Sequence, residues 1–221
     1  DGPNHAFELW NQVQGDPDGA YFQRPTWDNP FHDRAGLEEA RRTLSRQQFD
    51  QEYGADFAAL HGAIYSDFTI GRNVHATHPV TGAPIELDPN DEVLIGQDYN
   101  AGYIAAVIGR KVGDEIWITD ERLTTTTIFD HADALRDWLR AKGINHERQV
   151  SLFSDASGEY NASNNETSDN RIMRKAGFRV RHDRTNPKVM DRIHAVQALI
   201  YNGERRVRLH VHPRCRELIR C

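Results

Sequence analysis

Cysteine is scarce in this chain of 221 residues, and long apolar runs are absent. The two cysteines, Cys215 and Cys221, both fall in the last seven positions, so no disulfide framework holds the fold together. The best apolar run, residues 103–108, is only long enough for a strand, whereas a membrane span needs about 18 apolar residues. With a mean hydropathy of −0.72, the composition excludes a membrane protein and favours one globular core that packs without covalent support.

Several sequence signatures are also missing. No G-x-x-x-x-G-K-[ST] loop is present, so the chain holds no complete nucleotide-triphosphate site of that kind. Serine and cysteine show no credible arrangement for nucleophilic catalysis. No basic start followed by an apolar stretch indicates a signal peptide, so we expect a cytoplasmic protein, and we expect that Asp1 is not the natural N-terminus.

Charge is distributed unevenly along the chain. Residues 1–170 carry a net charge of −16, whereas residues 171–221 carry +10, and 12 of the 14 basic residues there are arginine. Arginine binds phosphates in a bidentate manner, so this excess predicts a surface for a polyanion such as nucleic acid. The same arginines could instead solvate helix faces and pair with the acidic part of the chain.

The first part of the chain reads as a connection with helices. Residues 1–70 are turn-rich early, and their later apolar spacing predicts amphipathic helices over 35–45 and 47–57. Residues 71–90 contain four Pro or Gly residues after Gly71 and are expected to form a loop. We therefore expect the main domain to span residues 91–221.

From residue 91 onward, the pattern predicts three hairpin-linked strands and then alternating helices and strands. The first strands are expected over 93–97, 103–109 and 115–119. Helices are then expected over 128–141, 168–176 and 187–201, and Ser168 and Asn186 are the expected caps of the last two. Strands are expected over 149–153 and 178–181. An edge strand over 207–211 follows the last helix. This order is that of an α/β, ribonuclease H-like fold with a mixed sheet flanked by helices.

Three aspartates fall at one edge of this predicted sheet. Asp98 ends the first strand, Asp155 follows the fourth, and Asp191 lies in the last long helix. Like charges about 4 Å apart repel by roughly 4 kcal/mol at an effective dielectric of 20, so such a cluster needs a cation. Carboxylate oxygens favour Mg²⁺ or Mn²⁺, and two such ions support phosphodiester hydrolysis.

Each aspartate also has a simpler interpretation. Asp98 can open a hairpin turn, Asp155 can be an ordinary loop residue, and Asp191 can be an exposed helical residue beside Arg192. The conjunction of all three at the required positions favours catalysis. Glu121 and His194 share the same edge as secondary candidates. Glu121 could add a metal ligand or hold a water, but a polar strand end explains it as well. His194 could assist a metal or shuttle a proton, but a packed or solvated histidine is the simpler interpretation.

The C-terminal residues suggest a zinc site that the spacing does not support. His210, His212, Cys215 and Cys221 are the ligand types that zinc prefers, yet their spacing matches no familiar zinc motif. A strand followed by a short helix is the alternative.

Several runs resemble the large terminase subunit of tailed double-stranded DNA bacteriophages. They are TWDNP at 26–30, FDQEY at 49–53, IGQDY at 95–99, SDASG at 154–158 and NP at 186–187 leading to DRI at 191–193. The resemblance covers nearly the whole chain and implies a C-terminal ribonuclease H-like nuclease domain. It places the family's metal-binding acids on Asp98, Asp155 and Asp191, the residues that the strand ends select.

The resemblance also implies a setting. The run GPNHAF at 2–7 resembles the end of the family's ATPase motor domain, so residues 1–70 would be the connector from a motor missing here, and the chain a fragment. Implied partners are double-stranded DNA, a small terminase subunit, the portal of the procapsid and that motor in the same chain, all in the cytoplasm of the infected host cell.

The combined hypothesis is an Mg²⁺- or Mn²⁺-dependent endonuclease that cleaves concatemeric viral DNA with two metal ions. Arg184, Lys188 and Arg192 are the candidates for holding DNA phosphates. Two alternatives stay open: another ribonuclease H-like nuclease, such as a junction resolvase, a transposase or a hybrid nuclease, or a non-catalytic DNA-binding or assembly module.

Overall fold

The computed structural model describes residues 5–56, 64–100, 102–160 and 167–220. The chain forms two compact units. The first comprises Asp1–Thr69 and Val189–Arg208, and the second comprises Ile70–Lys188 and Leu209–Cys221.

The second unit is built around a six-stranded mixed sheet with the order β5-β4-β1-β2-β3-β6. Strands β1, β2 and β3 pair antiparallel, whereas β4 lies parallel beside β1, β5 beside β4, and β6 beside β3. The strands are β1 Val93–Asn100, β2 Tyr103–Val112, β3 Glu115–Thr124, β4 Val150–Ser154, β5 Arg179–Arg181 and β6 Leu209–Val211. This arrangement confirms the expected α/β, ribonuclease H-like class.

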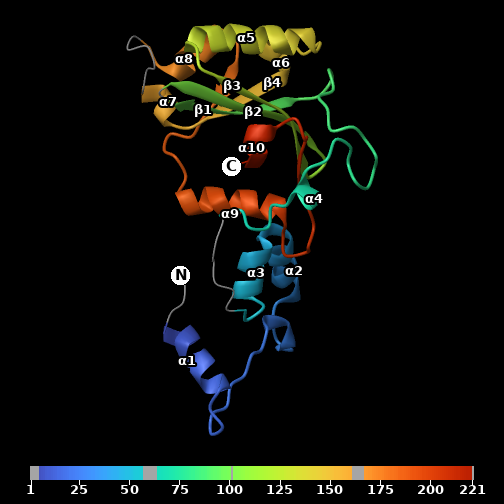
Figure 1. Cartoon of the computed structure of the whole chain (residues 1–221), viewed down its shortest axis with the longest axis vertical. Helices are drawn as coiled ribbons and strands as arrows, with labels where there is room; N and C mark the ends of the chain where they lie inside the picture. The colour runs from blue at the N-terminus through green and yellow to red at the C-terminus, as the bar shows by residue number, and fades with distance from the viewer. Residues whose placement is uncertain (1–4, 57–63, 101, 161–166, 221) are drawn as a thin grey trace. The chain divides into compact units, whose positions relative to one another are not determined.

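Helices α5 and α8 cover one face of the sheet (Figure 1). Their apolar side chains pack on alternate residues of β1 and β4, which form the largest buried cluster of the described residues. The helices of this unit are α4 Ile70–Asn73, α5 Ile128–Ala141, α6 His146–Gln149, α7 Ser157–Tyr160, α8 Asp169–Lys175 and α10 Arg216–Arg220. Thr127 caps α5 by accepting a hydrogen bond from the backbone of Asp130.

A β-bulge lengthens the meander beyond the prediction. The register between β2 and β3 shifts at Gly109, and a Cβ atom there would collide with the carbonyl oxygen of Trp117. Glycine therefore permits the close approach of the two backbones, and β3 continues to Thr124 instead of ending at residue 119.

The first unit is helical, and a small aromatic cluster forms its core. Its elements are α1 His5–Gln14, the 3₁₀ helix Thr26–Asp28, α2 Arg34–Thr43, α3 Arg46–Glu52 and α9 Val189–Ile200. Phe49 of α3 is buried and stacks on Trp27 and Tyr53, and Ser45 and Gln48 form a capping box at the start of α3. Asn202, just after α9, donates to the carbonyl of Arg42 and so ties α9 to α2.

The structure differs from the sequence-based expectations at the start of three helices. Helix α1, which directly precedes the turn-rich residues that begin at Gly15, was not predicted. Helix α9 begins at Val189 rather than 187, and the side chain of Asn186 binds elsewhere instead of capping it. Ser168 does occupy the N-cap of α8, but its side chain makes no capping hydrogen bond. Within the described residues, no helix combines the length and apolarity needed to cross a membrane.

Candidate active site

Asp98 and Asp155 lie at the carboxyl ends of adjacent parallel strands. The register between β1 and β4 pairs Gln97 with Ser154, so the next residue on each strand is one of the two aspartates. Parallel strands end at the same edge of a sheet, and ligands bind at such edges. The sheet therefore brings these two predicted residues to one edge, as the strand pattern indicated.

The two carboxylates differ in their surroundings. Asp98 is exposed, and its Oδ2 atom accepts a hydrogen bond of 2.7 Å from Asn100 Nδ2. Asp98 alternates with the core residues Val93 and Ile95, so it lies on the sheet face opposite to α5 and α8. Asp155 is partly buried, and its Oδ1 accepts from the backbone N–H of Gly158 at 3.3 Å.

Asn186 holds the chain directly after Asp155. The Asn186 Oδ1 atom accepts a 2.7 Å hydrogen bond from the backbone N–H of Ala156. This contact ties the exposed segment 181–188 to the turn that carries Asp155. The sequence pattern predicts a capping role for Asn186, because a contact 30 residues away leaves no local signal.

Asn170 braces both aspartate-bearing strands from α8. Its Oδ1 atom accepts hydrogen bonds from Ser154 Oγ at 2.7 Å and from Tyr99 Oη at 3.1 Å, and Ser154 and Tyr99 are the immediate neighbours of the two aspartates. Burial, and then the charge of Asp169, raise the pKa of Tyr99 well above its usual value, so this hydroxyl stays a donor. Sequence reasoning missed this brace, which depends on the packing of α8 against the sheet.

Asp191 lies on α9, in the first unit, where it is exposed. Because Asp98 and Asp155 belong to the second unit, the convergence of Asp191 with them stays a prediction. The half-buried His194 lies one turn further along α9, in the same unit as Asp191.

Glu121 has a clear structural role. Both of its carboxylate oxygens accept backbone hydrogen bonds, from Glu217 at 2.9 Å and from Leu218 at 2.8 Å. These donors lie in the first turn of α10, where a carboxylate satisfies unpaired N–H groups and the helix dipole. Glu121 therefore caps α10.

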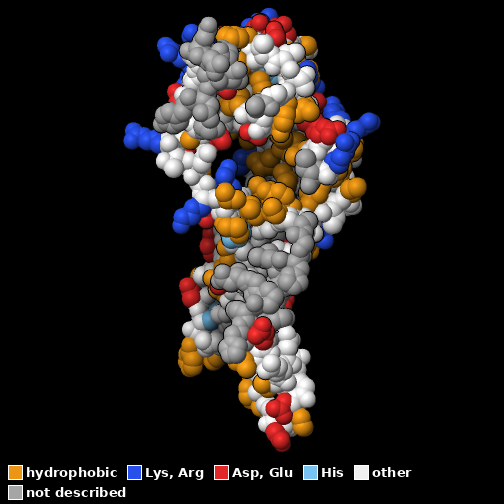
Figure 2. All heavy atoms as spheres, turned by 60° about the vertical axis from the view of Figure 1, so that its left-hand side comes forward, with side chains coloured by type: hydrophobic (Ala, Val, Ile, Leu, Met, Phe, Trp, Pro, Cys, Tyr) orange, Lys and Arg blue, Asp and Glu red, His pale blue; other side chains and the backbone are white. Residues whose placement is uncertain are grey.

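The basic C-terminal part contains cations in two kinds of surroundings. Arg174 binds Glu159, Arg205 binds Asp50, and Arg214 binds Glu86. In contrast, no ion pair to another described side chain involves the predicted phosphate-binding residues Arg184, Lys188 and Arg192, which are all exposed. On the face drawn in Figure 2, Lys and Arg side chains stand at separate places rather than in one continuous patch.

The donor set at this edge fits a hard divalent cation. Asp98 and Asp155 offer carboxylate oxygens, which are the ligands that Mg²⁺ and Mn²⁺ prefer. Their exposed and partly buried positions leave them accessible from solvent. Asn100 donates to one oxygen of Asp98, and the Gly158 N–H donates to one oxygen of Asp155, so each carboxylate is oriented by a neutral donor.

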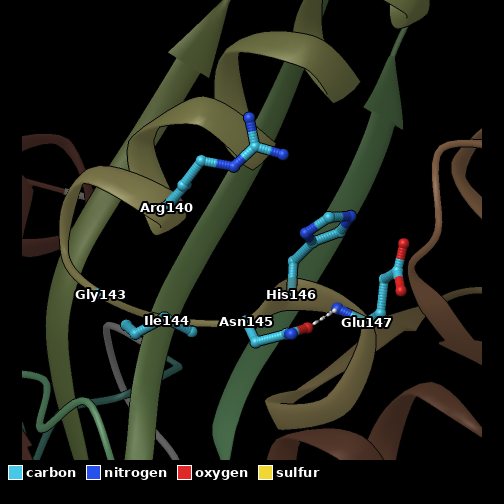
Figure 3. Close-up of a pocket in the computed structure, with 6 residues that line it drawn as sticks. All are labelled: Arg140, Gly143, Ile144, Asn145, His146 and Glu147. Carbon is cyan, nitrogen blue, oxygen red and sulfur yellow. Dashed lines mark hydrogen bonds between the residues drawn. The ribbon is translucent and has the colours of Figure 1, made fainter.

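A separate cavity lies away from this edge. It measures about 380 Å³ and is lined by the end of α5, the following turn and α6, including Arg140, His146 and Glu147 (Figure 3). Within its wall, the Asn145 side chain accepts a hydrogen bond from the backbone N–H of Glu147. Because α6 directly precedes β4, the cavity is at the amino end of that strand, whereas Asp155 follows its carboxyl end.

The zinc hypothesis for the C-terminal residues does not hold. Among the described residues, neither His212 nor Cys215 belongs to a group of possible metal ligands, and His212 Nδ1 accepts hydrogen bonds from the backbone and side chain of Arg214. Cys221 lies outside the described residues. His210 is turned into a different group of side chains, with His78 and Glu115.

Comparisons with known proteins point to large terminases. No family model matches the chain. The large terminase subunit of Escherichia phage T5 is 51% identical over 41 residues, which is 19% of this chain and 9% of that protein. The large terminase of a thermophilic bacteriophage superposes with a TM-score of 0.62 and 15% identity over 99% of this chain. The complex of that thermophilic phage protein with ADP gives a TM-score of 0.63 and 14% identity.

These comparisons confirm the predicted resemblance at the level of the fold. The chain shares the fold of large terminases over nearly its whole length, and it spans about half, 51%, of the thermophilic phage protein.

Proposed function

We propose that this chain is the nuclease part of a phage large terminase subunit, a metal-dependent endonuclease that cleaves concatemeric double-stranded viral DNA during genome packaging. One observation carries the proposal. Asp98 and Asp155 end adjacent parallel strands of a ribonuclease H-like sheet, within a fold shared with the thermophilic phage large terminase over 99% of the chain.

In this proposal, Asp98, Asp155 and Asp191 hold two Mg²⁺ or Mn²⁺ ions. When bound, the ions supply an activated water and stabilise the leaving oxygen of the phosphodiester. Asn186 and Asn170 are positioning residues, because they fix the backbone after Asp155 and the side chains beside both aspartates. Asn100 orients the Asp98 carboxylate.

Arg184, Lys188 and Arg192 would hold the DNA backbone. Arg184 and Lys188 flank Asn186, and the Asn186–Ala156 hydrogen bond keeps their segment next to the Asp155 turn. Contacts to phosphates position a duplex without reading its bases, so we expect low sequence preference.

The biological setting follows from the resemblance to large terminases. Residues 1–70 would connect residues 91–221, the nuclease core, to an ATPase motor in the same chain. A small terminase subunit and the procapsid portal would be the protein partners, in the cytoplasm of the infected host cell.

Cleavage of supercoiled plasmid tests the proposal. The chain is incubated with Mn²⁺, with Mg²⁺ and with EDTA, and nicked and linear products are measured. We expect metal-dependent cutting that Asp98→Asn and Asp155→Asn abolish, because each variant removes a carboxylate charge at the predicted metal site. Asp137→Asn, an exposed change on α5, is the matched control and should cut normally.

The same assay separates the alternatives. Selective cutting of four-way junctions or RNA–DNA hybrids, with intact duplex spared, would favour another ribonuclease H-like nuclease. Duplex binding without cutting under any metal, unchanged in Asp155→Asn, would overturn the nuclease proposal in favour of a binding module.

A further inference from the structure

Three metal-ligating side chains meet in the second unit, apart from the aspartates. His78 comes from the segment between α4 and β1, Glu115 opens β3, and His210 lies on β6. The parallel register pairs His210 with Trp117, two residues beyond Glu115 on the same face of β3. Three stretches that are distant in sequence thus place these side chains together.

Their ligand atoms lie at the spacing that one ion requires. The Glu115 Oε2 atom is 3.1 Å from His78 Nε2 and 3.6 Å from His210 Nε2, and all three atoms are within 4.8 Å of one another. Two ligands about 2.0–2.2 Å from a tetrahedral zinc ion lie roughly 3.3–3.6 Å apart. An ion at the centre therefore fits with small side-chain shifts.

His210 gives a second, independent indication. Its side chain is only 2% exposed, and neither ring nitrogen has a hydrogen-bond partner among the described residues. A buried imidazole without partners costs free energy, whereas a metal ion would satisfy one nitrogen.

We propose that His78, Glu115 and His210 together bind one Zn²⁺ ion. Two imidazole nitrogens and one carboxylate favour zinc over Mg²⁺, which prefers oxygen ligands alone. Three protein ligands leave a fourth position for water. The site would cross-link the segment before β1 to the β3–β6 edge of the sheet, independently of the proposed nuclease chemistry.

Neighbouring groups hold His78 and Glu115 in place. The segment carrying His78 is held by hydrogen bonds from His78 N to Ala83 O at 2.7 Å and from Gly82 N to His78 O at 2.9 Å. Trp117 Nε1 donates to Glu115 Oε2 at 2.9 Å, and its ring stacks on His78. Ligating carboxylates and histidines are oriented by contacts of this kind.

Zinc binding requires one change of tautomer. His78 Nδ1 accepts a hydrogen bond of 3.1 Å from the backbone N–H of Thr81, so without metal its proton sits on Nε2 and points to Glu115. Thr81 Oγ1, also 3.1 Å from Nδ1, is the acceptor available when that proton moves to Nδ1. Binding should therefore switch the His78 tautomer, which nitrogen-15 NMR of the imidazole can detect.

Zinc titration of the metal-stripped chain tests the proposal. With excess Mg²⁺ present to occupy hard-oxygen sites, we expect one equivalent of Zn²⁺ to bind in competition with a chromophoric chelator. At saturating zinc, Tm should rise by about 5–10 °C. Glu115→Gln and His210→Asn should each weaken binding at least as much as the roughly 10- to 100-fold that loss of an outer-shell contact costs.

The controls isolate this site. His212→Asn makes the same substitution two residues along the chain and should keep full zinc affinity, as should Asp155→Asn in the proposed nuclease site. Circular dichroism of Glu115→Gln confirms folding. No binding by the unchanged chain, or binding equally tight in folded Glu115→Gln and His210→Asn, would overturn the zinc site without bearing on the nuclease proposal.

Discussion

Asn170 is the residue on which the geometry next to both aspartates depends. Replacing it with alanine removes the acceptor shared by Ser154 and Tyr99. Loss of a positioning contact of this kind typically costs roughly 10- to 100-fold in metal affinity or activity. We expect Asn170→Ala to need a correspondingly higher Mn²⁺ concentration for half-maximal plasmid cleavage.

Tyr99→Phe is the matched variant for this brace, since it removes one donor and keeps the ring. It should show a smaller change in the Mn²⁺ requirement than Asn170→Ala. If Asn170→Ala cut with an unchanged metal requirement, the brace would have no part in the site.

His131 should make stability depend on pH. The side chain is 1% exposed on α5, and its Nδ1 lies 2.9 Å from Thr124 Oγ1. Burial, and then the charge of Arg122, lower its pKa from 6.5 to about 4. The unfolded chain therefore binds a proton between these values that the folded chain does not, so stability is complete above pH 6.5 and falls as the pH drops toward 4.

The loss over this range should be on the order of 3 kcal/mol. Urea unfolding between about pH 7 and pH 4 measures it. His131→Gln removes the titrating group and keeps a polar partner for Thr124, so its curve should be flatter by that amount. The pKa of His210 is also lowered, so His210 adds to the pH dependence of stability equally in the unchanged chain and in His131→Gln. Parallel curves for the two proteins would contradict the prediction.

Single residues show where sequence reasoning worked and where it could not. The position of Asp98 and Asp155 could be predicted because a strand end is visible in the local pattern, and the register of β1 and β4 brings them to one edge, whereas their metal-binding role stays a prediction. Asn170 and Asn186 were missed as positioning residues because their partners are 16 and 30 residues away. His78 and Glu115 were missed for the same reason.

At the scale of elements, Glu121 stabilises helix α10. Glu121→Ala removes the acceptor for two backbone N–H groups at the start of α10, and loss of a helix cap costs about 1–2 kcal/mol. We expect a lower urea midpoint and unchanged metal-dependent cleavage. Cleavage lost at unchanged stability would instead make Glu121 a metal ligand.

Element length decided which elements could be predicted. The boundaries of α5, at 14 residues, were predicted correctly because its apolar spacing continues over several turns. The four-residue helices α4, α6 and α7 are shorter than one full repeat of that signal, so no period reveals them. Strands β1 to β3 were predicted but shortened, since polar residues such as Asp98 and Asp120 still pair within the sheet.

At the scale of the whole molecule, the basic C-terminal part is less available than its composition indicates. Residues 171–221 carry +10, yet Arg174, Arg205 and Arg214 are engaged in ion pairs, and Arg179 donates to backbone carbonyls. Some of the excess arginines therefore pair with acidic residues, and others stay available for a polyanion. Arg184, Lys188 and Arg192, which form no ion pair with another described side chain, are the cations that the proposed function assigns to DNA phosphates.

The salt dependence of duplex binding distinguishes the cations that contact DNA from the arginines that are already engaged in ion pairs. The logarithm of the binding constant falls with the logarithm of salt concentration by about 0.9 for each phosphate neutralised. Arg184→Ala and Lys188→Ala should each lower the slope by about 1 and weaken binding uniformly across sequences. Arg174→Ala is the control of equal charge, because its guanidinium already pairs with Glu159 at 2.9 Å. If Arg174→Ala changed the slope as much as the other two, net charge rather than the segment beside Asp155 would govern DNA binding.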